Sequence, residues 1–191
     1  MDMQIRFLGA AESVTGSRHL LEINHSKIMI DCGLYQERQF RDRNWENFGV
    51  EPAEIDAILL THAHLDHCGL LPKLAEEGFK GKVYCTEATA EIAEIVLADS
   101  GKIQEEDAQY KIKRHKRANY TPPRPVEPLY TQEQARNCSA LFAPVQYNVP
   151  VDIAEGITAT FHEAGHIFGS SIVRLVASFN GEQRTIIFSG D

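Results

Sequence analysis

Features that mark several protein classes are missing from this sequence of 191 residues. Its start, MDMQIRFLGA, has no basic segment followed by an apolar run, and no stretch reaches the roughly 18 apolar residues that a membrane-spanning helix needs. We therefore expect a cytoplasmic protein that does not bind a membrane. The sequence also lacks a G-x-S-x-G elbow, a Walker A loop and a dinucleotide-binding glycine motif, so a serine hydrolase, an NTPase and a Rossmann enzyme have no support.

The sequence has only four cysteines, Cys32, Cys68, Cys85 and Cys138, and no two of them form a C-x-x-C pair. We expect four reduced thiols rather than a disulfide framework or a structural zinc site. Positive charge is in deficit as well, with a formal net charge of -8. This balance argues against a surface that coats nucleic acid uniformly, so a polyanion would have to meet a local patch.

One basic patch lies in KIKRHKR, residues 111–117. Its cations are Lys111, Lys113, Arg114, Lys116 and Arg117, and Arg124 follows shortly. These side chains are candidates for binding nucleic acid. The alternative is a solvated helix end, which is favourable because cations complement the dipole at a helix C-terminus.

Apolar patterns predict strands in both halves of the chain. QIRFLGA, HLLEIN and KIMIDCG are typical of an antiparallel meander, while EIDAILLTHA indicates a strand buried on both faces and KVYCT a further strand. The final third predicts strands in VQYNVPVDI, GITATFHEA, SSIVRLVASF and QRTIIFSGD, the last two joined by an Asn-Gly turn at 180–181. With the helices between them, these strands predict an α/β (α+β) fold of two sheets with helices outside.

Three helices are predicted between the strands. LLPKLAEEGF indicates a helix ended by Gly78, and a long amphipathic helix is expected from Thr86 or Glu87 toward Lys116, with Gly101 as a candidate bend. Its apolar face is predicted to comprise Ile92, Ile95, Val96, Leu97 and Ile103. TPPRPVEPLY is too rich in proline for a helix or central strand and predicts a surface connection, after which Thr131 and Gln134 form the capping box of a short helix.

Four side chains able to bind metal follow the buried strand AILLT within six positions: His62, His64, Asp66 and His67. His62 and His64 alternate with Ala63, so an extended backbone sends both imidazoles to the same side. Asp66 and His67 come after a change of direction and can face a second ion. This spacing predicts a two-metal site, and its ligand types favour zinc, with iron and manganese as alternatives.

A second histidine-rich stretch, HEAGH at 162–166, matches the H-E-x-x-H pattern of helical zinc proteases. The surrounding window does not favour a helix, because ITATF is β-branched and alternating, and Gly165 and Gly169 are poor helix formers. We predict a strand through GITATFHEA with His166 in the loop beyond it. The protease match is therefore interpreted as accidental.

Two aspartates repeat the arrangement of an acidic residue at a strand end. Asp191 follows TIIF and is a candidate carboxylate for bridging two ions, although a turn aspartate is the alternative. Asp31 follows IMI and is expected to accept hydrogen bonds from the histidine loop, again with an ordinary turn residue as the alternative.

Together these motifs resemble a known family. THAHLDHCGLLP resembles the H-x-H-x-D-H signature of the metallo-β-lactamase fold. IRFLGAAESVTGSRHLLE, IDCGLYQ, EAGHIFGSS and FSGD resemble its β-CASP branch of nucleic-acid-processing nucleases. The resemblance implies an αββα sandwich and two Zn²⁺ ions whose ligands are His62, His64 and His166 for one, Asp66 and His67 for the other, and Asp191 between them. It also implies a water that attacks phosphorus in line, with Asp66 as the expected base.

The family resemblance implies a zinc-dependent phosphodiesterase acting on RNA, with DNA as the alternative substrate. In this family the chain continues after the Asp191 motif into a β-CASP domain and returns to complete the second sheet. We therefore expect residues 1–191 to be the N-terminal part of a metallo-β-lactamase-like domain, an incomplete sandwich without the β-CASP portion. Because terminal residues fray, we expect it to bind metal weakly and cleave poorly alone.

Two other functions remain open from the sequence. The same pair of ions can polarise a carbonyl, which would make the protein a hydrolase of small thioesters, lactones or β-lactams. A non-catalytic scaffold subunit that keeps the fold is the other alternative. The sequence predicts no oligomeric state.

Overall fold

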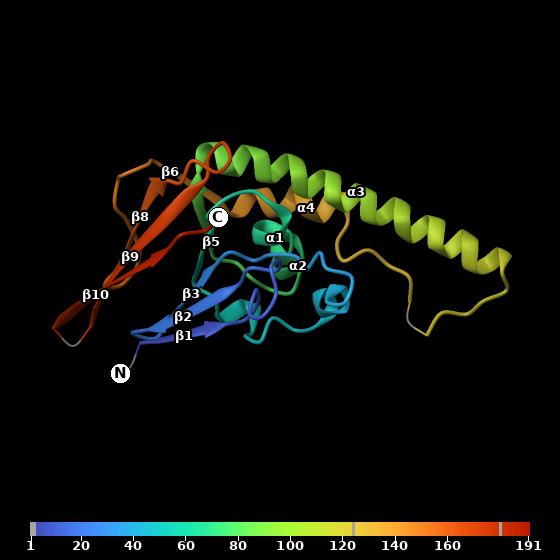
Figure 1. The fold of residues 1–191 in the computed structure, drawn as a ribbon, viewed down its shortest axis with the longest axis horizontal. Coiled ribbons are helices and arrows are strands. Elements are labelled where there is room, and N and C mark those ends of the chain that lie inside the picture. The colour runs from blue at the N-terminus through green and yellow to red at the C-terminus, as the bar shows by residue number, and fades with distance from the viewer. Residues whose placement is uncertain (1–2, 124, 180) are drawn as a thin grey trace.

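A computed structural model describes residues 3–123, 125–179 and 181–191, which form two β-sheets and a layer of helices (Figure 1). The six-stranded sheet has the order β1-β2-β3-β4-β5-β6, and the four-stranded sheet has the order β10-β9-β8-β7. Strands of the first sheet are β1 (Gln4–Phe7), β2 (His19–Ile23), β3 (Ser26–Ile30), β4 (Ala57–Leu59), β5 (Lys82–Thr86) and β6 (Phe142–Val145). Strands of the second are β7 (Val151–Ala154), β8 (Ile157–Glu163), β9 (Ser171–Phe179) and β10 (Glu182–Phe188).

The predicted meander is confirmed, since β1, β2 and β3 pair antiparallel. From β3 onward the pairing is parallel through β4, β5 and β6. Ile30 on β3 is the register partner of Leu59 on β4, so these two strands end at the same edge of the sheet. The residues that follow them, Asp31 and Thr61, are thereby brought close together.

The helices are α1 (Leu65–Cys68), α2 (Leu71–Glu76), α3 (Glu87–Arg117) and α4 (Gln132–Cys138), with short 3-10 turns at Arg41–Trp45, Pro52–Glu54 and Ser139–Leu141. Helix α2 ends just before Gly78, which has a φ of +117°. The predicted capping box is confirmed on α4: Thr131 Oγ1 accepts from the Gln134 amide, and Gln134 Oε1 accepts from the Thr131 amide.

The long helix α3 forms as predicted, with Thr86 as its N-cap, and its apolar face was predicted in part, since Leu97 is buried and Ile92 and Val96 pack half-buried against the core. Ile95 and Ile103 are 69% and 51% exposed, whereas the buried side consists largely of small residues: Thr89, Ala90, Ala93, Leu97, Gly101 and Ala108. Small residues allow close contact with α4. A Cβ atom on Gly101 would lie 2.8 Å from backbone atoms of Thr131, so this glycine permits that contact and the helix is continuous through it.

Two apolar clusters lie on opposite faces of the six-stranded sheet. Ile58 belongs to the cluster beneath the helices, and its neighbour Leu59 belongs to the cluster between the sheets, where Phe161 and Leu175 from the second sheet meet it. The alternation confirms that β4 is buried on both faces. The described helices pack on the first cluster, which gives three of the four layers of the αββα sandwich that the family resemblance implies.

Other predictions have mixed outcomes. VQYNVPVDI is wrong as a single strand, because it contains the end of β6, a turn and the start of β7. Strands β9 and β10 pair antiparallel as expected, although Asn180 of the predicted turn lies outside the described residues, as does Arg124 of the proline-rich connection. All four cysteines are free, as predicted, and the structure shows that all four are buried. In the described part of the chain, no helix is both long and apolar enough to span a membrane.

Candidate metal centre

The histidine loop, residues 61–67, leaves the end of β4 and is held by the neighbouring end of β3. The Thr61 amide donates to Asp31 Oδ1 at 2.8 Å, and the Asp31 amide donates to the Leu59 carbonyl at 3.1 Å. The loop is also held from another segment of the chain, because the Ser17 amide donates to the Asp66 carbonyl at 2.8 Å. A Cβ atom on Gly33 would lie 1.6 Å from that same carbonyl oxygen, so only glycine fits there.

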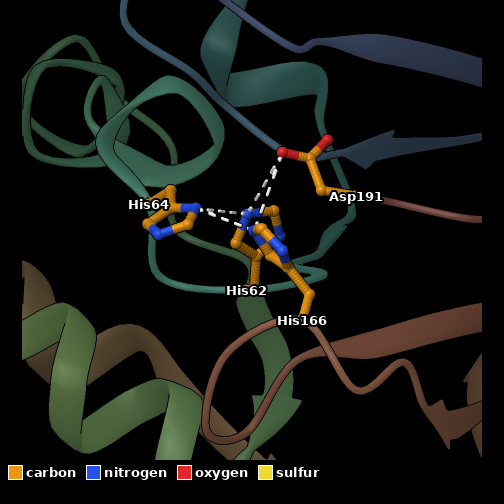
Figure 2. Close-up of side chains that lie close together, drawn as sticks. All are labelled: His62, His64, His166 and Asp191. Carbon is orange, nitrogen blue, oxygen red and sulfur yellow. Dashed lines mark hydrogen bonds and ion pairs between the residues drawn. The ribbon is translucent and has the colours of Figure 1, made fainter.

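Three imidazoles converge beyond the end of β4 (Figure 2). His64 Nδ1 lies 3.1 Å from His62 Nε2 and also 3.1 Å from His166 Nε2, although His166 is 102 positions from His64. Donor atoms around a tetrahedral zinc ion with Zn–N bonds of about 2.1 Å are about 3.4 Å apart. The spacing of these nitrogens therefore suits a single small cation.

Asp191 lies between this first group and a second one. Its Oδ2 atom is 3.9 Å from His62 Nε2 and 3.8 Å from His166 Nε2, while its Oδ1 atom is 3.4 Å from His67 Nε2. His67 Nε2 is in turn 3.8 Å from Asp66 Oδ2. The donor atoms thus form two groups, each within 4.8 Å: one of His62, His64, His166 and Asp191, and one of Asp66, His67 and Asp191.

Hydrogen bonds behind the rings orient two of the histidines. His67 Nδ1 lies 2.7 Å from Asp31 Oδ2, and His62 Nδ1 lies 3.0 Å from Thr61 Oγ1. Both contacts leave the Nε2 atom facing the centre, which is the arrangement that fixes a metal-binding tautomer. Asp31 therefore makes the contacts expected of it, whereas Thr61 was missed by the sequence reasoning, although it directly precedes His62.

The surroundings shift the pKa values of two histidines, His62 and His67. Burial, with the nearby His67, lowers the pKa of His62 to about 4, so its ring is neutral at pH 7 and has a free lone pair. Burial also lowers the pKa of His67, but the hydrogen bond and charge of Asp31 more than offset it and leave the pKa raised. The anionic surroundings that stabilise a protonated His67 also favour a bound cation.

The loop carrying His166 is fixed to the start of α3. Ser170 Oγ accepts from the amides of His166 at 3.1 Å and Ile167 at 3.2 Å, and the Gly169 carbonyl accepts from the hydroxyls of Thr86 and Thr89, each at 2.7 Å. These supporting residues were not found from the sequence; the partners of Gly169 lie about 80 positions away, whereas Ser170 binds amides only three and four positions away. Only the run of small residues in HIFGSS was a signal.

The structure places His162 outside this centre. The residue lies on β8, as predicted, and its Nδ1 atom is 2.7 Å from Asn148 Oδ1. His162 and His166 share no helix, so the protease interpretation of HEAGH is excluded.

A cleft of about 1270 Å³ opens beside the centre. It begins at His64 and Asp66 and follows α3 as far as Lys111. The other cations of the basic patch, Lys113, Arg114, Lys116 and Arg117, are exposed at the end of α3 and line neither donor group. The patch is therefore separate from the metal centre.

Comparisons with known proteins agree with this geometry. Residues 16–191 match the Metallo-beta-lactamase superfamily. Ribonuclease TTHA0252 of Thermus thermophilus is 39% identical over 99% of this chain, and Transcription termination factor FttA of Methanocaldococcus jannaschii is 31% identical over 91%. Integrator complex subunit 11 of Danio rerio is 26% identical over the whole chain. The chain spans 38%, 25% and 29% of the lengths of these three relatives.

Solved structures show the same fold. A B3 metallo-beta-lactamase with an active-site glutamic acid superimposes with a TM-score of 0.56 at 19% identity, covering 97% of this chain and 59% of that one. The subclass B3 enzyme MEM-A1 gives a TM-score of 0.56 at 19% identity, covering 96% and 59%. At this identity the likeness concerns the fold alone.

Proposed function

We propose that this chain, which belongs to the metallo-beta-lactamase superfamily, forms the metal-binding part of a hydrolase that cleaves phosphodiester bonds in RNA. The observation that carries the proposal is the position of Asp191, whose two oxygens face two separate groups of donor atoms. RNA is favoured as the substrate class because the names of the relatives denote a ribonuclease, a transcription termination factor and an Integrator subunit.

The donor chemistry supports two zinc ions. One would be held by His62, His64 and His166, the other by Asp66 and His67, with Asp191 shared. Neutral imidazoles and carboxylates are ligands that zinc prefers, and the neutral state of His62 supports this assignment. When bound, such ions supply Lewis acidity and make water nucleophilic near neutral pH.

The protein's own residues would accept the proton of the attacking water and orient the metal-binding histidine rings. Asp66 is partly exposed at the mouth of the cleft, and we assign it the role of accepting a proton from the attacking water. Asp31 and Thr61 do not reach the substrate side; they hold the rings of His67 and His62 from behind. Substitution of Asp31 or Thr61 would therefore reduce activity indirectly, because the histidine ligands would be misplaced.

We also propose that residues 1–191 alone cleave RNA slowly. The three relatives are each more than twice as long as the segment they share with this chain. We infer that residues 1–191 form the N-terminal part of a metallo-β-lactamase-like domain, and that side chains beyond them contribute to turnover. The test therefore measures metal content as well as cleavage.

The test loads the 191-residue protein with zinc, determines metal content by mass spectrometry, and incubates it with labelled single-stranded RNA and DNA. We expect two zinc ions per chain and slow RNA cleavage, both reduced in His64→Ala. His162→Ala is the matched control, because this histidine lies outside both donor groups, and it should behave as the unmodified protein. Hydrolysis of a chromogenic β-lactam without RNA cleavage would contradict the proposal and support a small-molecule hydrolase.

A further inference from the structure

The C-terminal part of α3 extends away from the two sheets (Figure 1). Ala108 is the last buried residue of the helix, and Tyr110 beyond it is 65% exposed. None of the ion pairs formed by the described residues includes a cation from 111–117. The described part of the protein therefore leaves these charges free to meet an external anion.

One face of this helix end combines an aromatic ring with three cations. Tyr110, Lys113, Arg114 and Arg117 follow the i, i+3, i+4, i+7 spacing and so lie on one side of α3. We call these four residues the α3 stripe. Exposed aromatic side chains stack on unpaired bases while neighbouring cations meet phosphates, which is the recognition pattern for single-stranded nucleic acid. A duplex offers no free base faces to Tyr110.

We propose that the α3 stripe binds single-stranded RNA as a second anchor, separate from the metal centre, on a strand whose scissile phosphate lies at that centre. The inference rests on the proposed function for the position of the scissile bond. The cleft connects the two places, because its lining includes His64 at one end and Lys111, which lies between Tyr110 and Lys113 of the stripe, at the other. The strand thus has a continuous path.

The cleft itself is a poor anchor for phosphates. Acidic side chains outnumber basic ones in its lining and repel a polyanion, while Ile95 and Ile103 present apolar surface that suits bases. The acidic residues are Asp42, Asp66, Asp99, Asp107 and Glu127, and the basic ones are Arg41 and Lys111. The cleft-lining part of α3, from Ile95 to Lys111, is about 24 Å long at ~1.5 Å rise per residue. A stacked strand covers that span in about seven nucleotides at ~3.4 Å each. Strands shorter than this reach only one anchor.

The first experiment measures RNA binding by the α3 stripe in metal-free protein. Fluorescence anisotropy in EDTA gives the affinity of a labelled oligouridylate of twelve nucleotides at several salt concentrations. Lys113→Ala/Arg114→Ala/Arg117→Ala should lower affinity at least tenfold and reduce the salt slope by about two. Tyr110→Ala should lower affinity about fivefold or more without changing the slope.

A charge-matched control is Lys80→Ala/Lys82→Ala/Lys102→Ala, which removes three exposed cations elsewhere and should bind as the unmodified protein does. Equal losses in the control and the stripe variant would overturn the assignment, because binding would then follow net charge alone. An unchanged affinity in the stripe variant would overturn it too.

The second experiment measures how long an RNA strand must be to reach both the metal centre and the α3 stripe. Zinc-loaded protein is titrated with phosphorothioate oligouridylates of four to sixteen nucleotides, which resist hydrolysis. We expect affinity to rise steeply near seven nucleotides, and the rise to vanish in the stripe variant; a smooth increase in both would refute the two-anchor arrangement. Cleavage of unmodified RNA is scored separately, so failure of hydrolysis with a retained affinity step would reject the proposed function and leave the stripe standing.

Discussion

The carboxylate of Asp31 lies 2.7 Å from Nδ1 of His67, although the two residues are 36 positions apart. Parallel strands β3 and β4 end side by side, and this places the aspartate after one strand against the loop after the other. Both side chains are buried, at 3% and 6% exposure. Because Asp31 holds Nδ1, the Nε2 atom of His67 is directed toward Asp66 and Asp191.

Substitution of Asp31 should weaken metal binding. Asp31→Asn keeps the size of the side chain but removes the charge that orients His67, and loss of such a partner typically costs about tenfold to a hundredfold in metal affinity. Competition with a chromophoric chelator measures the change. Asp152→Asn, which alters an exposed hydrogen bond to Thr158, is the control and should have no effect. Equal affinities in the two variants would show that Asp31 does not act on the centre.

Two glycines near His166 should differ sharply in their tolerance of alanine. Gly169 has a φ of +85°, and a Cβ there would lie 2.6 Å from the Thr89 amide nitrogen, whereas Gly165 has a φ of +73° and no atom within 4 Å of such a Cβ. Gly165→Ala should cost about 1 kcal/mol for backbone strain, and Gly169→Ala at least about 2 kcal/mol more because of the clash. Urea unfolding compares the two. Similar free energies of unfolding would mean that the contact with α3 contributes little.

Local patterns indicated the cluster of donors that is close in the chain and the carboxylate of Asp191 at a strand end, whereas His166 was expected as a ligand only from the family resemblance. His62, His64, Asp66 and His67 lie within one short loop, so their convergence needs only the end of a strand and a turn. The partners of the Gly169 carbonyl, Thr86 and Thr89, depend on how β8 and β9 pack against the start of α3, which no local pattern encodes. The apolar face of α3 was predicted only in part for a related reason: Gly101 is buried because of Thr131, a residue on a different element.

The buried thiols should be inert in the folded protein. Burial raises the pKa of Cys32, Cys85 and Cys138 to about 12 and raises that of Cys68 as well. At pH 8 less than about one thiol in a thousand is then the reactive thiolate. Ellman's reagent should therefore detect almost no thiol in native protein and four in guanidinium chloride. Rapid reaction of one thiol in native protein would show local opening of the core.

Glu37 should titrate far below an ordinary glutamate. Its carboxylate accepts a hydrogen bond from the Thr15 hydroxyl and backbone bonds from Val14 at 3.0 Å and Thr15 at 3.1 Å, and these bonds lower its pKa from 4.5 to about 2. A depressed folded-state pKa stabilises the protein fully above pH 4.5, and the contribution is lost as pH falls through about 2. Carboxyl-detected NMR gives this pKa directly. Thr15→Val should raise it toward 4.5, and an unchanged value would mean that the hydroxyl is not its main cause.

Asp191 should affect both metal ions, unlike the residues that belong to one donor group. Its two oxygens face different groups, so Asp191→Asn should weaken both zinc ions, whereas His166→Ala should weaken one and Asp66→Ala the other. Calorimetric titration of zinc into the metal-free protein counts the ions and separates their affinities. If Asp191→Asn lowered the affinity of a single ion only, the carboxylate would be an ordinary ligand of one group. The proximity of the two groups would then have to come from the histidine loop alone.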